Sequence, residues 1–421
     1  MIINNDEPCF EGYLLVQPEF SKNTYLINED KQVVHKWRSN YSQSLASYLL
    51  ENGSILRSCY GGIISLLWGG GFTGRIEMID WDSNRIWEFK YLSFNHCLHN
   101  DIEPLPNGNV LMIVWERKTN REILEAGCNP DLIPIGGFRM DGIIEVEPIY
   151  PYGGNIVWEW HVFDHLIQDY DETKNNYGVV AEHPELMDIN IQGENRFGHW
   201  FHTDYSHLNS IDYIEEYDQL LISSRNLNEI WIIDHSTTTE EAAGHTGGNY
   251  GKGGDLLYRW GNPQVYRAGN ESDQQLYAQH DARWLIINNS DERHITIFNN
   301  GVSRSDMDYS SVEEIIIPVD ENGNYYLEPG SAYGPEEPIW TYGKNEHFFY
   351  SPYLCSAQRL PNGNTLINNG VYGSIFEVNL EKEIVWRYIN RFPLMIPPIN
   401  SVFKVQYYSK DYPGLDRLDI S

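Results

Sequence analysis

Polar side chains that together suit an oxyanion lie in the stretch 200–234. His207 and Asn209 stand two residues apart ahead of an expected strand, and Arg225 follows across an expected hairpin. Because residues two apart in a strand share a face, His207 and Asn209 should point the same way, and Arg225 can return to the same end. An imidazole, an amide and a guanidinium at one place offer several donors and a nucleophile, which suits sulfate or phosphate. A histidine ahead of a strand is also commonly a hydrogen-bonded structural residue.

Histidines recur at comparable places along the chain. His99 precedes one hairpin, His207 precedes another, and His280 lies in YAQHDARWL, ahead of a third strand pair. If these segments are equivalent parts of a repeated unit, their imidazoles converge. Repeats also copy structural residues, so a repeated histidine can simply satisfy the end of a strand. The sequence leaves open whether His96 competes with His99 for the same place.

Three converging imidazoles would also suit zinc, copper or iron. A histidine-ligated metal oxidoreductase is therefore an alternative function, and a non-catalytic propeller that binds a small molecule is another. The fixed positive charge of Arg225 opposes a cation at the same place. We accordingly expect no metal and no cofactor at this site.

The elements that must position these residues are short β-strands in a repeated unit. Each unit is a strand, a turn rich in Asp and Asn, and a strand ending near a tryptophan. The tryptophans are Trp37, Trp87, Trp158, Trp260, Trp340 and Trp386. A hairpin cannot bury its own faces, so six copies predict an all-β protein, a six-bladed β-propeller with one tryptophan per blade packing between neighbours. The dipeptides Asn52-Gly53 and Asn107-Gly108 mark two of the hairpin turns.

We expect residues 1–421 to form a single propeller domain with long loops between strands. A strand-like run near 401–409 should pair with the N-terminal blade and close the ring. Residues 161–199 form an insertion that we expect to cap one face with a short amphipathic helix. A second insertion, 236–255, lacks the phosphate-loop pattern and is expected to be a flexible rim loop.

The composition excludes several classes of partner. The chain has 421 residues, with 29 Lys and Arg against 60 Asp and Glu, so its formal net charge is -31. Nucleic acid and anionic membranes are therefore unexpected partners, and the apolar runs have only strand length. The first residues, MIINNDEPCFEGY, show no export signal, so we expect a cytoplasmic protein, or an exported one whose leader has been removed. A homodimer is left open.

Four motifs, taken in order, resemble the bacterial arylsulfate sulfotransferase family. They are HNDIEPLPNGN, HLNSIDY followed by ISSRNLNEIWIID, QHDARWL and RLPNGNTLI. The resemblance runs from about Gly12 to Leu415. It implies a six-bladed propeller that moves a sulfuryl group from an aryl sulfate ester to a phenol, independently of the nucleotide donor PAPS. It also implies a ping-pong reaction through a sulfohistidine.

The resemblance also assigns roles to residues. It implies that His280 is the nucleophile, and that His99 and His207 are further catalytic residues, one of which would act as a general acid and base. The partners would be a small aromatic sulfate donor and a phenolic acceptor.

The sulfate group itself would be held by polar side chains. The resemblance places Asn209 and Arg225 in this role, where they would neutralise the sulfuryl oxygens. The family also uses a threonine in its last blade. Ser351 and Ser356 are the candidates for its counterpart, and we assign Ser356 to substrate binding.

Overall fold

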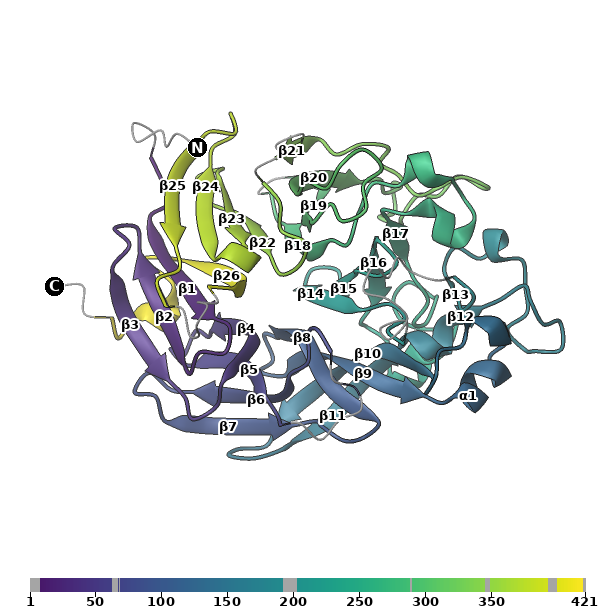
Figure 1. The fold of residues 1–421 in the computed structure, drawn as a ribbon, viewed down its shortest axis with the longest axis horizontal. Helices are drawn as coiled ribbons and strands as arrows, with labels where there is room; N and C mark the ends of the chain where they lie inside the picture. The colour runs from purple at the N-terminus through teal and green to yellow at the C-terminus, as the bar shows by residue number, and fades with distance from the viewer. Residues whose placement is uncertain are drawn as a thin grey trace.

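The computed structural model describes residues 8–62, 67, 69–191, 203–287, 290–344, 349–392 and 400–418. In this part of the chain, six antiparallel four-stranded sheets stand around a common centre (Figure 1). The predicted six-bladed all-β propeller is therefore confirmed. From the inner to the outer strand, the first three blades are β26 (Val402–Ser409), β1 (Gly12–Pro18), β2 (Asn23–Asn28) and β3 (Val33–Arg38); β4 (Gln43–Leu49), β5 (Ile55–Tyr60), β6 (Gly74–Ile79) and β7 (Arg85–Lys90); and β8 (His96–Pro104), β9 (Val110–Lys118), β10 (Phe138–Pro148) and β11 (Gly154–His161). The other three are β14 (Leu208–Ile214), β15 (Gln219–Ser224), β16 (Glu229–Asp234) and β17 (Tyr258–Trp260); β18 (His280–Leu285), β19 (Arg293–Asn299), β20 (Ser311–Ile317) and β21 (Trp340–Tyr342); and β22 (Ser356–Arg359), β23 (Thr365–Asn369), β24 (Ser374–Val378) and β25 (Ile384–Ile389).

The first blade is built from both ends of the chain. Strand β26 pairs antiparallel with β1, so that Tyr13 lies opposite Tyr408 and Leu15 lies opposite Gln406. Figure 1 shows the yellow β26 beside the purple β1 at the centre of the ring. The innermost strand of the first blade is therefore supplied by the last strand of the chain.

Each of the six tryptophans lies in the outermost strand of its blade, as the repeat predicts. In five blades the indole N–H donates to the following blade. The donor and acceptor pairs are Trp87 with Gly153, Trp158 with Thr237, Trp260 with Pro335, Trp340 with Leu380 and Trp386 with Glu29. Trp37 instead packs edge-on against Trp81 of the second blade, with ring centroids 5.3 Å apart. The tryptophans thus join neighbouring blades at the outside of the ring.

The inner strands are irregular where their polar side chains gather. Asn100, His207 and Asp281 have φ values of 52°, 49° and 51°, in the left-handed region. Asn, Asp and His tolerate this region better than most residues. The pairing of β8 with β9, of β14 with β15 and of β18 with β19 shifts register near these positions. Such bulges redirect side chains, and here they lie beside the three histidines that the repeats single out.

Helices are few and short. The insertion 161–199 does not contain the expected amphipathic helix in its described part, which ends at residue 191. The Gln168 side chain instead accepts the backbone N–H groups of Tyr170 and Asp171 and forms a turn. The short elements of the described chain are α1 (Asn120–Glu125), η1 (Pro130–Leu132), η2 (Val162–His165), β12 (Leu166–Ile167), η3 (Val180–Glu182), β13 (Met187–Asp188), α2 (Thr239–Ala242), η4 (Pro263–Tyr266), η5 (Glu271–Asp273), η6 (Gly370–Tyr372) and η7 (Pro413–Leu415). None of the helices in the described ranges has the length and apolar character needed to cross a membrane.

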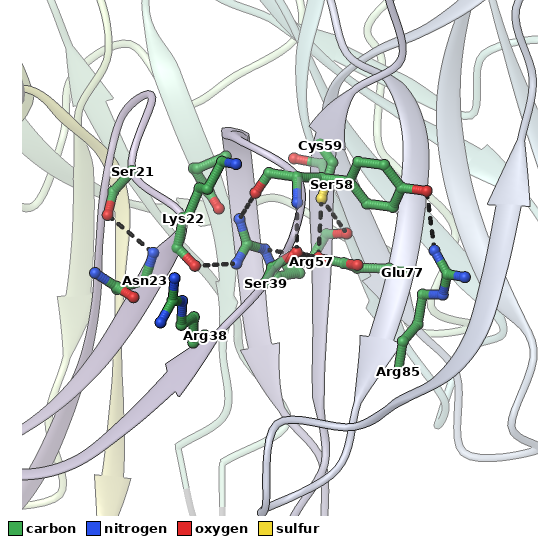
Figure 2. Close-up of polar contacts among 12 residues, drawn as sticks. Ser21, Lys22, Asn23, Arg38, Ser39, Arg57, Ser58, Cys59, Glu77 and Arg85 are labelled. Carbon is green, nitrogen blue, oxygen red and sulfur yellow. Dashed lines mark hydrogen bonds and ion pairs between the residues drawn. The ribbon is translucent and has the colours of Figure 1, made fainter.

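A buried ion pair within the second blade is linked to the first blade by hydrogen bonds. Figure 2 shows Arg57 of β5 facing Glu77 of β6, with Nε 3.5 Å from Oε1. The Arg57 guanidinium also donates to the Lys22 carbonyl oxygen at 3.5 Å. Ser39 and Cys59 both direct their side chains at the Glu77 carboxylate. Through Lys22 and Ser39, these contacts connect the first blade to the second.

Candidate active site

The three histidines lie at one end of three neighbouring inner strands. His99 is in β8, His207 directly precedes β14, and His280 begins β18. Arg225 directly follows β15, and its backbone N–H donates to the His207 carbonyl oxygen at 3.1 Å. Strand β14 contacts β8 on one side and β18 on the other. The charges of Arg225 and His99 act on His207, and those of Arg225 and His207 act on His280, so the four side chains lie near one another.

His99 is buried with both of its ring nitrogens engaged. The Asn100 amide donates to Nδ1 at 3.0 Å, so Nε2 carries the proton and donates to Asp141 at 2.6 Å. The ring also stacks on Trp115, with centroids 4.0 Å apart. Burial lowers the pKa of His99 to about 3, and burial together with the nearby charge of Asp204 raises the pKa of Asp141 to about 8. His99 is therefore a neutral, fixed ring that presents no free nitrogen.

His207 forms a dyad with a carboxylate. Its Nδ1 lies 2.6 Å from Asp204 Oδ2, and Nε2 lies 3.4 Å from the Asn100 amide nitrogen. Burial works against the charged carboxylate of Asp204, but the positive charges of His207 and Arg139 outweigh it and hold its pKa below the usual range. Burial lowers the pKa of His207 and the Asp204 charge opposes that shift. An anionic Asp204 holds the proton on Nδ1 and leaves Nε2 to exchange a proton with a ligand.

His280 has the tautomer that a nucleophile needs. Its Nδ1 faces two acceptors, the Asn300 side-chain oxygen at 2.7 Å and the Ala278 carbonyl oxygen at 3.2 Å. The Asn300 amide group donates to the Ser351 carbonyl oxygen at 2.7 Å, which fixes its orientation. The proton therefore lies on Nδ1, and within the described part of the chain Nε2 has no hydrogen-bond partner. Burial and the nearby Arg225 charge lower the pKa of His280 to about 3, so the Nε2 lone pair is available at neutral pH.

Arg225 supplies positive charge beside these rings. One guanidinium nitrogen donates to the Asn226 side chain at 3.0 Å. Among the described residues it forms no ion pair, and burial lowers its pKa. Its charge also lowers the pKa of both His207 and His280, as expected for a neighbour of both rings. A guanidinium with unused N–H groups is suited to the oxygens of a sulfate or phosphate ester.

Asn209 and Ser356 both make hydrogen bonds to the backbone of the neighbouring blade. The Asn209 amide donates to the Gln279 carbonyl oxygen at 2.7 Å. The Ser356 hydroxyl accepts the Val405 backbone N–H at 3.1 Å. In the described chain, Asn209 Oδ1 is buried and has no hydrogen-bond partner. Both side chains therefore join adjacent blades.

The surroundings of His96 and the position of possible metal ligands also bear on the site. His96 stacks on Tyr91, with centroids 4.0 Å apart, whereas His99 stacks on Trp115. The cluster of metal-ligand type found in the described residues consists of His165, His245 and Asp255, which lie outside this site. The central histidines are poorly suited to bind a metal ion, because His99 has no free ring nitrogen and Arg225 adds a positive charge.

Four residues that orient the histidines were missed by sequence reasoning. Asn100 stands next to His99 in the HND motif, and Asp204 lies three residues before His207, so spacing could have suggested both. Asp141 and Asn300 come from β10 and from the end of β19, and only the folded sheet brings them to the rings. They fix which nitrogen carries the proton, and are part of the site's chemistry.

Comparison with known families shows which family the chain belongs to. The family model described as Arylsulfotransferase (ASST) matches residues 83–390, which is more than half of the chain. The chain belongs to this family. Membership supports an aryl sulfotransferase activity and bears out the resemblance seen in the motifs. No match is found among curated proteins.

Solved structures similar to this arylsulfotransferase family member have low sequence identity. A protein of unknown function from Bacteroides caccae is 12% identical with a TM-score of 0.47, and the match covers 94% of this chain and 98% of that one. A putative 6-phosphogluconolactonase from Bacteroides fragilis is 9% identical with a TM-score of 0.41, covering 96% and 100%. A hypothetical selenium-binding protein from Sulfolobus tokodaii is 10% identical with a TM-score of 0.41, covering 76% and 62%. At these scores the likenesses carry no argument about function.

Proposed function

We propose that the protein transfers a sulfuryl group from an aryl sulfate ester to a phenol through a sulfated His280, without a nucleotide sulfate donor. The observation that carries the proposal is the state of the His280 ring. Nδ1 is held as a donor by Asn300, the pKa is lowered to about 3, and Arg225 lies near enough to act on the ring electrostatically. A neutral imidazole beside a guanidinium suits attack on a bound sulfate ester.

In the first step, Nε2 of His280 forms a bond to sulfur and the bond between sulfur and the aryl oxygen breaks. The electron pair of that bond leaves with the aryl oxygen, and a proton from His207 Nε2 converts the phenolate to phenol. Asp204 stabilises the protonated form of His207 before this transfer. Arg225 neutralises the sulfuryl oxygens as charge shifts in the transition state.

In the second step, the acceptor phenol gives its proton to His207 Nε2 and its oxygen attacks sulfur. The bond between sulfur and His280 Nε2 breaks, and the electron pair returns to the ring. His207 is again protonated for the next donor, so the two steps balance. Splitting one transfer into two is the usual advantage of a covalent intermediate.

The other functions considered receive less support. A metal oxidoreductase needs ligands that converge on a cation, whereas His99 has both nitrogens bonded and Arg225 is cationic. A non-catalytic binding propeller does not explain why two rings, His207 and His280, are both held with Nδ1 protonated. We therefore carry forward the sulfuryl transfer.

The decisive experiment is intact-protein mass spectrometry after brief mixing with 4-nitrophenyl sulfate in the absence of acceptor. The quench is alkaline because a sulfated imidazole is acid-labile. We expect a mass gain of about 80 Da, one SO₃ group, together with release of nitrophenol. The His280→Ala variant should show neither.

His96→Ala is the matched control, because His96 is a partly exposed imidazole stacked on Tyr91 away from the cluster. It should gain the same mass as the wild type. An adduct that persists in His280→Ala would reject the proposed nucleophile. The absence of both adduct and nitrophenol in the wild type would reject the proposed reaction on this donor.

A further inference from the structure

A second group of histidines lies outside the ring, where two connections meet. His165 ends η2, just after the outermost strand β11 of the third blade. His245 and Asp255 lie in the connection between β16 and β17 of the fourth blade, after helix α2. His165 and Asp255 are buried, whereas the His245 side chain is 60% exposed. Segments far apart in the sequence thus bring three metal-ligand side chains together.

The three side chains share one oxygen atom. Nδ1 of His165 and Nδ1 of His245 each lie 2.8 Å from Oδ1 of Asp255. The ligand atoms of all three residues lie within 4.8 Å of one another. Two imidazole nitrogens and a carboxylate oxygen form a ligand set that zinc and related divalent metals take.

The hydrogen bonds of His165 make this set more than a cluster of polar residues. Its Nε2 lies 2.9 Å from the Ala242 carbonyl oxygen, which can only accept, so Nε2 carries a proton. Nδ1 of the same ring faces the Asp255 carboxylate, so it is the ring nitrogen placed to act as a ligand atom. A ligating histidine commonly donates its other N–H to a backbone carbonyl, as His165 does here.

The His165 ring is also held rigidly. It stacks on Trp160, with centroids 5.6 Å apart and planes 11° apart. The Trp160 indole N–H donates to the Gly254 carbonyl oxygen at 2.7 Å. A Cβ atom at Gly254 would stand 2.7 Å from His165 Nε2 and 2.0 Å from the Ala242 oxygen, so a glycine is needed for the close approach. Such support fixes the ring before a ligand binds.

We propose that His165, His245 and Asp255 bind one divalent transition metal ion, of the zinc class, and that the ion joins the two connections at the outside of the ring. Three protein ligands leave a position for water, as zinc sites with three protein ligands do. His245 also lines a cavity of about 510 Å³, together with Phe163, Tyr177 and His183, so the open position lies beside a space that a small ligand can enter. The formal net charge of -31 favours the uptake of cations.

The test is zinc binding by tag-free, full-length protein that has been stripped with a chelator. Zinc alone is titrated in competition with a chromophoric chelator, and thermal unfolding is followed with and without zinc. We expect one equivalent of zinc per chain and a zinc-dependent rise in Tm. In His245→Ala the affinity should fall at least about tenfold, and the rise in Tm should disappear.

His245 is chosen because its exposed ring can be removed without opening the core. His183→Ala is the matched control, because His183 lines the same cavity but bonds to Glu185 at 2.9 Å instead of joining the cluster. It should bind zinc like the wild type. Failure of the wild type to bind an equivalent of zinc, or equal binding by His245→Ala, would overturn the site. Neither readout depends on sulfuryl transfer.

Discussion

The side-chain oxygen of Asn300 lies 2.7 Å from Nδ1 of His280, and the amide nitrogen of the same Asn300 is held by the Ser351 carbonyl oxygen. The amide cannot turn over without losing the second bond, so it accepts from His280 and does not donate to it. The tautomer of His280 is thereby determined from outside the ring. Asn300 is a positioning residue for the proposed nucleophile.

Replacing Asn300 by Ala should slow formation of the sulfated enzyme by about 100-fold, since the ring loses both its orientation and its preferred tautomer. The rate of adduct formation with 4-nitrophenyl sulfate measures this directly. Asn364→Ala is the comparison, because the Asn364 amide donates to Glu377, outside the site. Equal rates in wild type and Asn300→Ala would show that Ala278 alone positions the ring.

The dyad of His207 and Asp204 should matter most for poor leaving groups. We expect Asp204→Asn to lower turnover of phenyl sulfate by about 100-fold or more, and turnover of 4-nitrophenyl sulfate much less, because nitrophenolate leaves without a proton. Steady-state rates with the two donors give the comparison. Asp218→Asn removes a similar carboxylate from His235, outside the site, and should leave the ratio unchanged. A uniform loss with both donors in Asp204→Asn would contradict proton transfer by His207.

Arg225 should act on the donor more than on the fold. Arg225→Ala is expected to lower kcat/KM for aryl sulfates by about 100- to 1,000-fold, since the sulfuryl charge loses its guanidinium. Arg267→Ala removes a half-exposed guanidinium that pairs with Asp188 and serves as the control. An unchanged kcat/KM in Arg225→Ala would remove it from the sulfate site.

The pKa of His280 also predicts how stability depends on pH. The value falls from 6.5 to about 3 on folding, so below pH 6.5 the unfolded chain takes up a proton at this position that the folded chain refuses. The stabilisation is complete above pH 6.5 and is lost as the pH falls toward 3. The difference in free energy of unfolding between the wild type and His280→Gln should therefore shift against the wild type by about 1.4 kcal/mol for each unit that the pH falls in this range. Urea unfolding at pH 7.0, 6.0 and 5.0 measures the difference, and a constant difference would contradict the buried neutral ring.

The repeat pattern predicted the fold because its signal is local. Tryptophans at strand ends and turns such as Asn52-Gly53 depend on a few adjacent residues, and the structure has Gly53 with a φ of 80° between β4 and β5. A local pattern can also mislead. The prediction of an amphipathic helix after residue 161 was wrong for the described part of that segment. His165, Leu166 and Ile167 are consecutive and all buried, a pattern that one face of a helix cannot provide.

The site was harder to predict, because its parts meet only through tertiary structure. His99, His207 and His280 stand out because each precedes a hairpin. Asp141 lies within β10 and Asn300 directly follows β19, and their roles follow from the bonds they make in the folded ring. The Asn209 amide donates to the Gln279 carbonyl oxygen, while its Oδ1 has no hydrogen-bond partner among the described residues, so its role at the sulfate site stays a prediction.

The participation of β26 in the first blade sets a condition on biosynthesis. Strand β26 is synthesised long after β1, so β1, β2 and β3 lack the innermost strand of their sheet until Ser409 has been added. A contact across so much sequence is slow to form, and an unpaired strand edge is exposed to aggregation in the meantime. Translation that stops before Val402 therefore leaves a first blade without its innermost strand.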